Sequence, residues 1–229
     1  SGLREDIGLE IKARSNPKLR TILNNKDQYP DAMIQSLYRN EELIDFVYNY
    51  PSKKGHVYTD TIGPVTKGRY PLLLQYDQRW GYGKYGYNVI GMNGCGPTST
   101  AMIIAGLTGR NNITPFDVAS YAYSHGYYQD GTSWSFFTEG MKHYGIYGRN
   151  IPLSYSSMKN EIMNGRPLIC SMKPGDFTTT GHLIVIRGMK QGMFIVNDPN
   201  SIKRSNRLWS YDTLSKQIRN MWSFSRQHY

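Results

Sequence analysis

The chain has 229 residues, which is enough for one good-sized domain or for one domain with an appendage. Its 27 Lys and Arg residues outnumber its 17 Asp and Glu residues and give a formal net charge of +10. No apolar run approaches the roughly 18 residues of a membrane-spanning helix, and two cysteines without a Cys-x-x-Cys pair exclude a disulfide framework and a zinc site of that type.

Residues 1–50 are predicted to form three short helices. Pro17 suits the first turn of one helix, and Asp31 opens a second. Asn40 can cap the third, which should end before Pro51 because the residue before a proline is pushed out of the α region. The apolar side chains that these helices would bury recur at helical spacing: Leu19, Ile22, Leu23, Met33, Ile34, Leu37, Leu43, Ile44, Phe46 and Val47. We expect these helices to pack against the rest of the chain as a prosegment or a cap.

Two units are predicted, a helical N-terminal extension with its linker over residues 1–66 and a domain over residues 67–229. In the domain, a Gly- and Tyr-rich loop over residues 80–93 leads into a helix that begins near Pro97 and ends at Gly109. Later helices are predicted over residues 114–123, 132–145, 154–164 and 212–221. Strands are predicted over residues 167–172, 183–187, 193–196, 208–209 and 222–224. Helices followed by antiparallel strands indicate the α+β class.

Cys95 stands out because it lies at the start of an apolar helix with a glycine on each side. A helix N-terminus carries about half a positive charge, which favours a thiolate over a thiol. Gly94 and Gly96 would let a substrate backbone approach closely and would leave amide N–H groups free to donate. A small buried core residue can have the same surroundings, so Cys95 needs a partner before it can be read as a nucleophile.

His182, at the start of a predicted strand, is the candidate base for such a nucleophile. Asp198 comes shortly after the next predicted strand. If the two strands form an antiparallel hairpin, His182 and Asp198 lie at the same end of the sheet, where the carboxylate can fix the histidine tautomer. Asn197 and Asn200 compete with Asp198 for this orienting role.

Two further residues complete the set of candidates. Gln75, at the end of an apolar segment, is placed to donate its side-chain amide to an oxyanion. Cys170 lies in an apolar strand with neither a flanking glycine nor a helix start, so we interpret it as a core thiol.

These candidates lie in motifs that resemble a known family. The motifs are Leu74-Gln75-Tyr-Asp-Gln-Arg-Trp80, Asn93-Gly-Cys95-Gly-Pro-Thr-Ser-Thr-Ala101-Met102, Gly181-His182 and Val196-Asn-Asp198-Pro199. They are similar to the papain-like cysteine peptidases of the bacteriocin-processing, double-glycine-leader type, and most of all to standalone bacterial relatives without a transporter. The resemblance covers roughly residues 70–226 and leaves residues 1–66 outside it.

The resemblance implies a papain-like fold, in which a helical half begins with the nucleophile helix and an antiparallel sheet carries the base and the acid. Carried over position by position, Cys95 is the nucleophile, His182 the base and Asp198 the orienting acid. Gln75 is the oxyanion donor, but it lies twenty positions before Cys95 where transporter-linked relatives have only a few, so Gln78 competes for this role. The implied activity is hydrolysis of a peptide or protein substrate through an acyl-thioester, with no cofactor and no metal.

Three functions are alternatives to peptide hydrolysis. A papain-like domain that only binds peptides would typically lose the nucleophile or the base, and both are present. An amidase or transpeptidase acting on cell-wall peptides would use the same triad, and the charge of +10 would help it dock to anionic wall polymers. Nucleic-acid binding is not expected, because Lys53-Lys54 and Lys203-Arg204 are the only adjacent basic pairs and no helix shows a basic stripe.

The N-terminal residues do not indicate the cellular compartment of the protein. The chain begins Ser-Gly-Leu-Arg, without a charged and then apolar leader. We expect an exported or cell-surface bacterial protein whose export segment is absent from this chain.

Overall fold

The computed structural model describes residues 2–227, and its N-terminal part is a set of packed helices. They are α1 (Leu3–Ala13), α2 (Pro17–Asn24), α3 (Asp31–Arg39) and α4 (Ile44–Lys53), with 3-10 turns η1 (Lys26–Gln28) and η2 (Glu41–Leu43) between them. The Asn16 side chain caps α2 by accepting from the Leu19 N–H at 3.1 Å. The predicted cap at Asn40 accepts from the Glu42 N–H at 3.1 Å. The region from α1 to α4 is termed the helical extension below.

The helical extension departs from the prediction at both of its ends. α1 is an additional helix, which buries Leu9 and Ala13 one turn apart. α4 runs through Pro51 for two further residues instead of ending before it. The proline lies in the last turn, so it removes only one backbone hydrogen bond. The Lys54 N–H then donates to the Tyr50 carbonyl oxygen at 2.9 Å and closes the helix beyond the proline.

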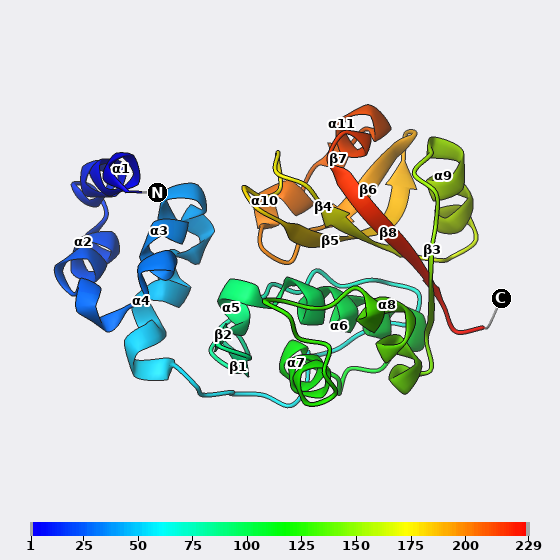
Figure 1. Cartoon of the computed structure of the whole chain (residues 1–229), viewed down its shortest axis with the longest axis horizontal. Helices are drawn as coiled ribbons and strands as arrows, with labels where there is room; N and C mark the ends of the chain where they lie inside the picture. The colour runs from blue at the N-terminus through cyan, green and yellow to red at the C-terminus, as the bar shows by residue number, and fades with distance from the viewer. Residues whose placement is uncertain (1, 228–229) are drawn as a thin grey trace.

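The helical extension packs against the segment that leads into the rest of the molecule. Phe46 of α4 stacks on Tyr82 with ring centroids 4.5 Å apart, and the Tyr82 hydroxyl donates to the Phe46 carbonyl oxygen at 2.8 Å. Tyr76 belongs to the same apolar cluster. The expected packing of these helices on the remainder is therefore present, and Figure 1 shows the blue helices beside the other two parts of the fold.

The helical half lies below the sheet in Figure 1. It contains β1 (Lys84–Tyr85), β2 (Asn88–Val89), α5 (Ile90–Asn93), α6 (Cys95–Thr108), α7 (Pro115–Ser124), α8 (Ser135–Thr138) and the 3-10 helix η3 (Gly140–Tyr144). α6 is buried over residues 96–106 and ends at the predicted Gly109, whose φ of 75° is left-handed. α7 begins with a capping box, in which Thr114 and Asp117 exchange hydrogen bonds of 2.9 and 3.1 Å.

Two segments of the helical half were predicted wrongly. Residues 80–93 are not a plain loop, because they hold the β1–β2 hairpin and α5. The single helix predicted over residues 132–145 is divided into α8 and η3. The second of these begins at Gly140, where a Cβ would come within 2.4 Å of the Phe136 ring. Close packing of Gly140 on the Phe136 ring therefore takes precedence over the single continuous helix that the sequence pattern predicts.

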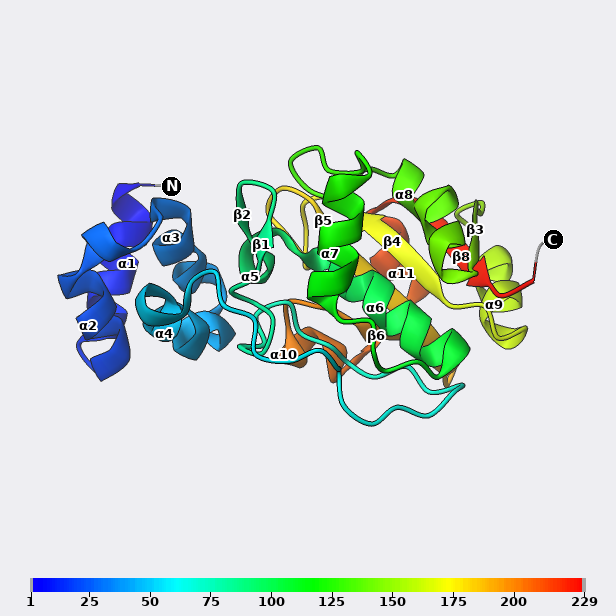
Figure 2. The same ribbon diagram turned by 90° about the horizontal axis from the view of Figure 1, so that it is seen from below.

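Within the described residues the main sheet has six antiparallel strands in the order β3-β8-β4-β5-β6-β7. The strands are β3 (Tyr147–Asn150), β4 (Leu168–Met172), β5 (His182–Lys190), β6 (Met193–Asn197), β7 (Leu208–Trp209) and β8 (Ile218–Ser225), and the helices between them are α9 (Tyr155–Met163), α10 (Ile202–Ser205) and α11 (Tyr211–Ser215). Val185 faces the core shared with α6, whereas Ile184 and Ile186 face a second core with α9 and α11. Figures 1 and 2 show the sheet between the helical half on one face and α9 and α11 on the other, which is the predicted α+β arrangement.

The C-terminal part differs most from the sequence prediction. The helix expected over residues 212–221 is only α11, and a long strand, β8, follows it. Leu214, Ile218 and Met221 are buried at helical spacing, which explains the error. β8 instead pairs with β3 on one side and with β4 on the other, so its backbone hydrogen bonds are made in two strand ladders.

Candidate active site

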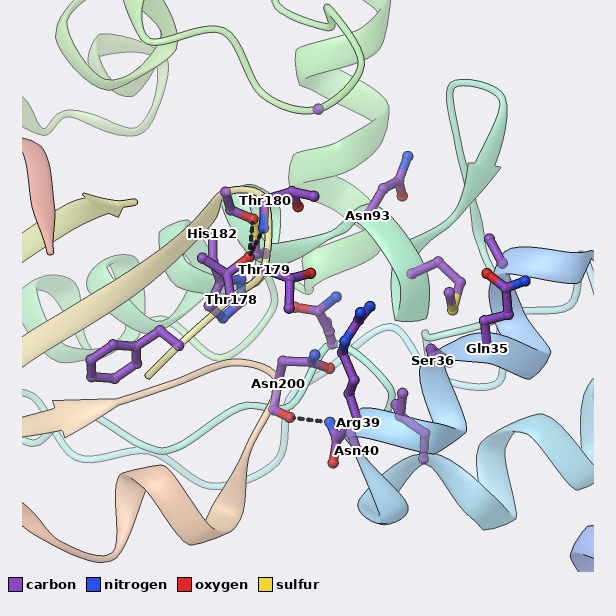
Figure 3. Close-up of a pocket in the computed structure, with 18 of the residues that line it drawn as sticks. Gln35, Ser36, Arg39, Asn40, Asn93, Thr178, Thr179, Thr180, His182 and Asn200 are labelled. Carbon is purple, nitrogen blue, oxygen red and sulfur yellow. Dashed lines mark hydrogen bonds between the residues drawn. The ribbon is translucent and has the colours of Figure 1, made fainter. Parts of the chain in front are cut away.

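Cys95 is the first residue of α6, and its side chain is partly buried. It lines a cavity of about 620 Å³ together with His182 and Gln75. The cavity lies where α6 meets the start of β5 and faces the helical extension (Figure 3). A partly accessible thiol at a helix N-terminus has the surroundings of a reactive cysteine.

The glycines beside Cys95 have a packing role that the sequence does not predict. A Cβ on Gly96 would come within 2.2 Å of the Thr132 hydroxyl, and a Cβ on Gly94 would meet Ile90 at 2.5 Å. Thr132 is itself fixed by a 2.6 Å hydrogen bond between its hydroxyl and that of Tyr85. Packing within the chain therefore requires glycine at both positions.

His182 is the first residue of β5 and lies opposite Met172 of β4. Its Nε2 is 2.7 Å from Asp198 Oδ1, and the ring lines the same cavity as Cys95. Because Nε2 bonds the Asp198 carboxylate, Nδ1 is the ring nitrogen that remains available to the Cys95 sulfur. Burial alone would lower the pKa of His182, but the Asp198 carboxylate and Cys95 together raise it to about 10. The ring is therefore held in its protonated form at neutral pH.

Asp198 follows β6 directly and is fully buried. Besides His182, it accepts from Arg204 Nε at 2.6 Å on Oδ2 and from the Asn200 N–H at 2.8 Å on Oδ1. Burial opposes the charged form, but His182 and Arg204 outweigh it and lower the pKa of Asp198. Sequence reasoning missed Arg204, which lies six residues after Asp198 on the short helix α10.

Of the rival candidates for the orienting role, Asn197 bonds other groups with its side chain, and the Asn200 side-chain oxygen is buried without a hydrogen-bond partner. Asn197 donates its amide to the carbonyl oxygens of Tyr70 and Pro71 and accepts from Arg187. The Asn200 carbonyl oxygen accepts from the Asn40 side chain at 2.8 Å. Among the candidates from the sequence, Asp198 is the one in hydrogen-bond contact with His182.

Gln75 and Gln78, the two candidates for the oxyanion role, also differ in their hydrogen-bond partners. Gln75 is buried and lines the cavity, and its Nε2 donates to the Gly91 carbonyl oxygen at 3.2 Å. That bond uses one of the two amide hydrogens. Gln78 instead accepts from Asn49 and Lys53 of α4, each at 3.2 Å. Gln75 therefore lines the same cavity as Cys95, and Gln78 faces the helical extension.

One wall of the cavity comes from the helical extension, which sequence reasoning had placed outside the site. Gln35, Ser36 and Arg39 of α3 and the following Asn40 line the cavity, across from the loop over residues 178–181 that precedes His182. Figure 3 shows Arg39 extending from the blue helix into the space between α3 and that loop, and Asn40 bonded to Asn200. The sequence does contain a signal for this wall, because Gln35, Ser36 and Arg39 lie away from the buried apolar face of α3.

Cys170 lies in β4 within the core and away from the cavity, as interpreted from the sequence. Burial raises the pKa of its thiol, so it stays protonated and inert. In residues 2–227, no group of three or more His, Cys, Asp and Glu side chains is arranged to hold a metal ion. The helices of the same region include none that is both long and apolar enough to span a bilayer.

Comparison with known proteins gives one family. The model described as the Peptidase C39 like family matches residues 67–228. The solved peptidase domain of Streptococcus ComA, a bifunctional ABC transporter involved in a quorum-sensing pathway, is similar with 19% identity and a TM-score of 0.45. That match covers 69% of this chain and 100% of the ComA domain. No curated protein matches the chain.

Proposed function

The chain belongs to the Peptidase C39 like family of cysteine peptidases, and from that premise we propose that it cleaves peptide bonds through a triad of Cys95, His182 and Asp198. The observation that carries the triad is the bridging position of the His182 ring. It bonds the buried Asp198 carboxylate at 2.7 Å through one nitrogen and lines the same cavity as Cys95, which together with Asp198 raises the pKa of the ring. A base held by an orienting acid against a thiol is the arrangement that nucleophilic catalysis requires.

The acylation half of the reaction follows from this geometry. The His182 imidazolium stabilises the Cys95 thiolate, whose sulfur forms a bond to the substrate carbonyl carbon. The carbonyl oxygen becomes an oxyanion, which the Gln75 amide and the Cys95 backbone N–H stabilise. His182 then gives its proton to the leaving amine, the C–N bond breaks, and the acyl group stays on sulfur as a thioester.

Deacylation reverses the roles. The neutral His182 ring takes a proton from water, and the hydroxide oxygen attacks the thioester carbonyl carbon. The C–S bond breaks, the acid leaves, and the thiolate–imidazolium pair forms again. Asp198 keeps its charge throughout and stabilises the imidazolium at both stages.

The substrate that we propose is a peptide that lies in the cavity between α3 and the loop over residues 178–181. A second substrate class is the peptide stems of the bacterial cell wall, which the charge of +10 favours through attraction to anionic wall polymers. That class fits an exported or surface-bound enzyme, working as an amidase or transpeptidase. Parallel incubation with purified cell wall and with a peptide carrying a Gly-Gly leader site separates the two, since hydrolysis releases new amine groups only from the true substrate, and transpeptidation is detected as new cross-links.

Selective alkylation tests the activated thiol without any choice of substrate. At pH 6 an ordinary thiol is almost fully protonated, so it reacts slowly with iodoacetamide. We expect Cys95 to react at least about tenfold faster than glutathione under the same conditions, because His182 stabilises its thiolate. Peptide mapping by mass spectrometry gives the rate at Cys95, with buried Cys170 as the unreactive internal reference. A Cys95 rate equal to that of glutathione would contradict the triad.

The oxyanion role distinguishes Gln75 from Gln78. Replacing Gln75 by alanine removes the amide beside Cys95, and we expect kcat to fall by about 100-fold with little change in KM. Gln78→Ala is the matched control, because its side chain bonds α4 and does not line the cavity. Equal kcat values for the two variants would remove Gln75 from the mechanism.

A further inference from the structure

One side chain of the helical extension is tied to the loop that carries the catalytic acid. Glu42, in η2, accepts hydrogen bonds from the Tyr76 hydroxyl at 2.6 Å and from the Ser201 hydroxyl at 3.0 Å. It also accepts from the backbone N–H groups of Ile202 at 2.7 Å and Lys203 at 3.2 Å. Burial opposes the charge on Glu42, but these donors outweigh it and lower its pKa. Glu42 is therefore a charged anchor for residues 201–203.

The residues that Glu42 holds are bonded in turn to Asp198. The Ser201 hydroxyl oxygen accepts from the Arg204 N–H at 3.0 Å, and Arg204 Nε donates to Asp198 Oδ2 at 2.6 Å. Ser205 donates its hydroxyl to the Ser201 carbonyl oxygen at 2.7 Å and accepts from the Asp198 N–H at 2.8 Å. Two hydrogen-bonded routes thus run from Glu42 through Ser201 to the acid.

A second contact between the same two segments lies at the floor of the cavity. Asn40 Nδ2 donates to the Asn200 carbonyl oxygen at 2.8 Å, a bond drawn in Figure 3. The Asn200 N–H donates to Asp198 Oδ1, the oxygen that also accepts from His182. The turn that joins α3 to α4 is therefore fastened to the residues that directly follow Pro199, from Asn200 to Lys203.

We propose that Glu42 is a positioning residue for the triad, and that the helical extension is a permanent part of the active site instead of a removable prosegment. This inference rests on the proposed function of Cys95, His182 and Asp198. Removal of the Glu42 carboxylate breaks four hydrogen bonds, three with residues 201–203 and one with the Tyr76 hydroxyl. Asp198 then shifts relative to His182, because Arg204 and Ser205 no longer have a fixed base.

The test compares Glu42→Ala with Glu41→Ala, its neighbour in sequence. Glu41 is exposed and pairs with Lys12 at 3.0 Å, so it offers a control of the same chemistry without a link to the loop. For Glu42→Ala we expect kcat to fall by about 10- to 100-fold, as for a displacement of the reacting groups by about 1 Å, with KM changed much less. We also expect the alkaline limb of the kcat profile to move to lower pH, since a displaced carboxylate supports the His182 imidazolium less well. Glu41→Ala should match the wild type in both.

Conservative variants keep the test decisive if Glu42→Ala does not fold. Glu42→Gln retains one acceptor oxygen, and Tyr76→Phe removes a single donor, so each should lose less kcat than the alanine variant and shift the alkaline limb in the same direction. A folded Glu42→Ala protein with wild-type kcat and pH profile would overturn the proposal. The alkylation rate of Cys95 at pH 6 separates the two hypotheses. A slow rate in the wild type refutes the triad itself, whereas a fast wild-type rate combined with an unchanged kcat and pH profile in Glu42→Ala refutes only the positioning role.

Discussion

Replacing Cys95 by alanine is expected to abolish peptide cleavage, with a loss in kcat of at least about 10⁴-fold. The methyl group cannot form the thioester, and the surrounding groups stabilise an oxyanion that no longer has a nucleophile to create it. The loss should occur without unfolding, because Cys95 lies at a cavity wall and not in the packed core. Digestion of a peptide library by wild type and variant side by side, read by mass spectrometry, measures the loss and gives the cleavage specificity.

The second cysteine supplies the control for this experiment. Cys170→Ala removes a thiol from the core beside β5, so it should lower the free energy of unfolding while leaving the cleavage pattern intact. If Cys95→Ala cut the same bonds as the wild type, a different residue would be the nucleophile.

Replacing Asp198 by asparagine is expected to lower kcat by about 10³- to 10⁴-fold. Three donors meet at this carboxylate, from His182, Arg204 and the Asn200 backbone. An amide offers only one acceptor oxygen, so at least one buried donor loses its partner and Arg204 faces an N–H group. The charge that supports the imidazolium is lost as well. Asp212→Asn, at an exposed position in α11, is the control, and steady-state kinetics with a cleaved library peptide is the measurement.

The same variant makes a prediction about pH. The pKa of His182 is raised to about 10 in the folded wild type, so the imidazolium persists through the neutral range and activity should fall only as pH rises toward that value. Without the Asp198 charge the alkaline limb should move to lower pH. The raised pKa also stabilises the fold fully below about 6.5, and this contribution disappears as pH rises toward about 10, because the native state keeps a proton that the unfolded chain releases. Urea unfolding should show that decline in the wild type and a flatter profile in Asp198→Asn; identical profiles would contradict the pairing.

The central groups of the candidate site could be chosen from sequence because their signals are local. Cys95 is marked by a glycine-flanked helix start, and His182 and Asp198 lie at corresponding ends of two strands of one hairpin. The hairpin register that brings them into contact follows from short-range pairing, which alternating apolar residues specify well. The capping box of Thr114 and Asp117 was predictable for the same reason.

The rest of the site depends on contacts between distant segments. Glu42 meets Tyr76 and residues 201–203 only after the helical extension has docked, and no local pattern marks Glu42 as different from Glu41. β8 was mistaken for a helix because its buried residues fit both periods, and the choice is made by its two neighbouring strands. The sequence predicts that Gly94 and Gly96 give a substrate close access. It does not predict that Ile90 and Thr132 occupy the positions that a Cβ on these glycines would take.

The position of β8 has a consequence for biosynthesis. It is the last strand of the described chain, yet it lies inside the sheet between β3 and β4. While residues 218–225 are still in the ribosome, β4 has an unpaired edge, and the strand order β3-β8-β4 cannot form. The sheet that carries His182 and Asp198 is therefore completed only after residues 218–225 have been translated, which makes folding dependent on contacts of long sequence separation. A nascent chain released before β8 should be devoid of peptidase activity and exposed to proteolysis, so the order of synthesis itself delays the enzyme until β8 has left the ribosome.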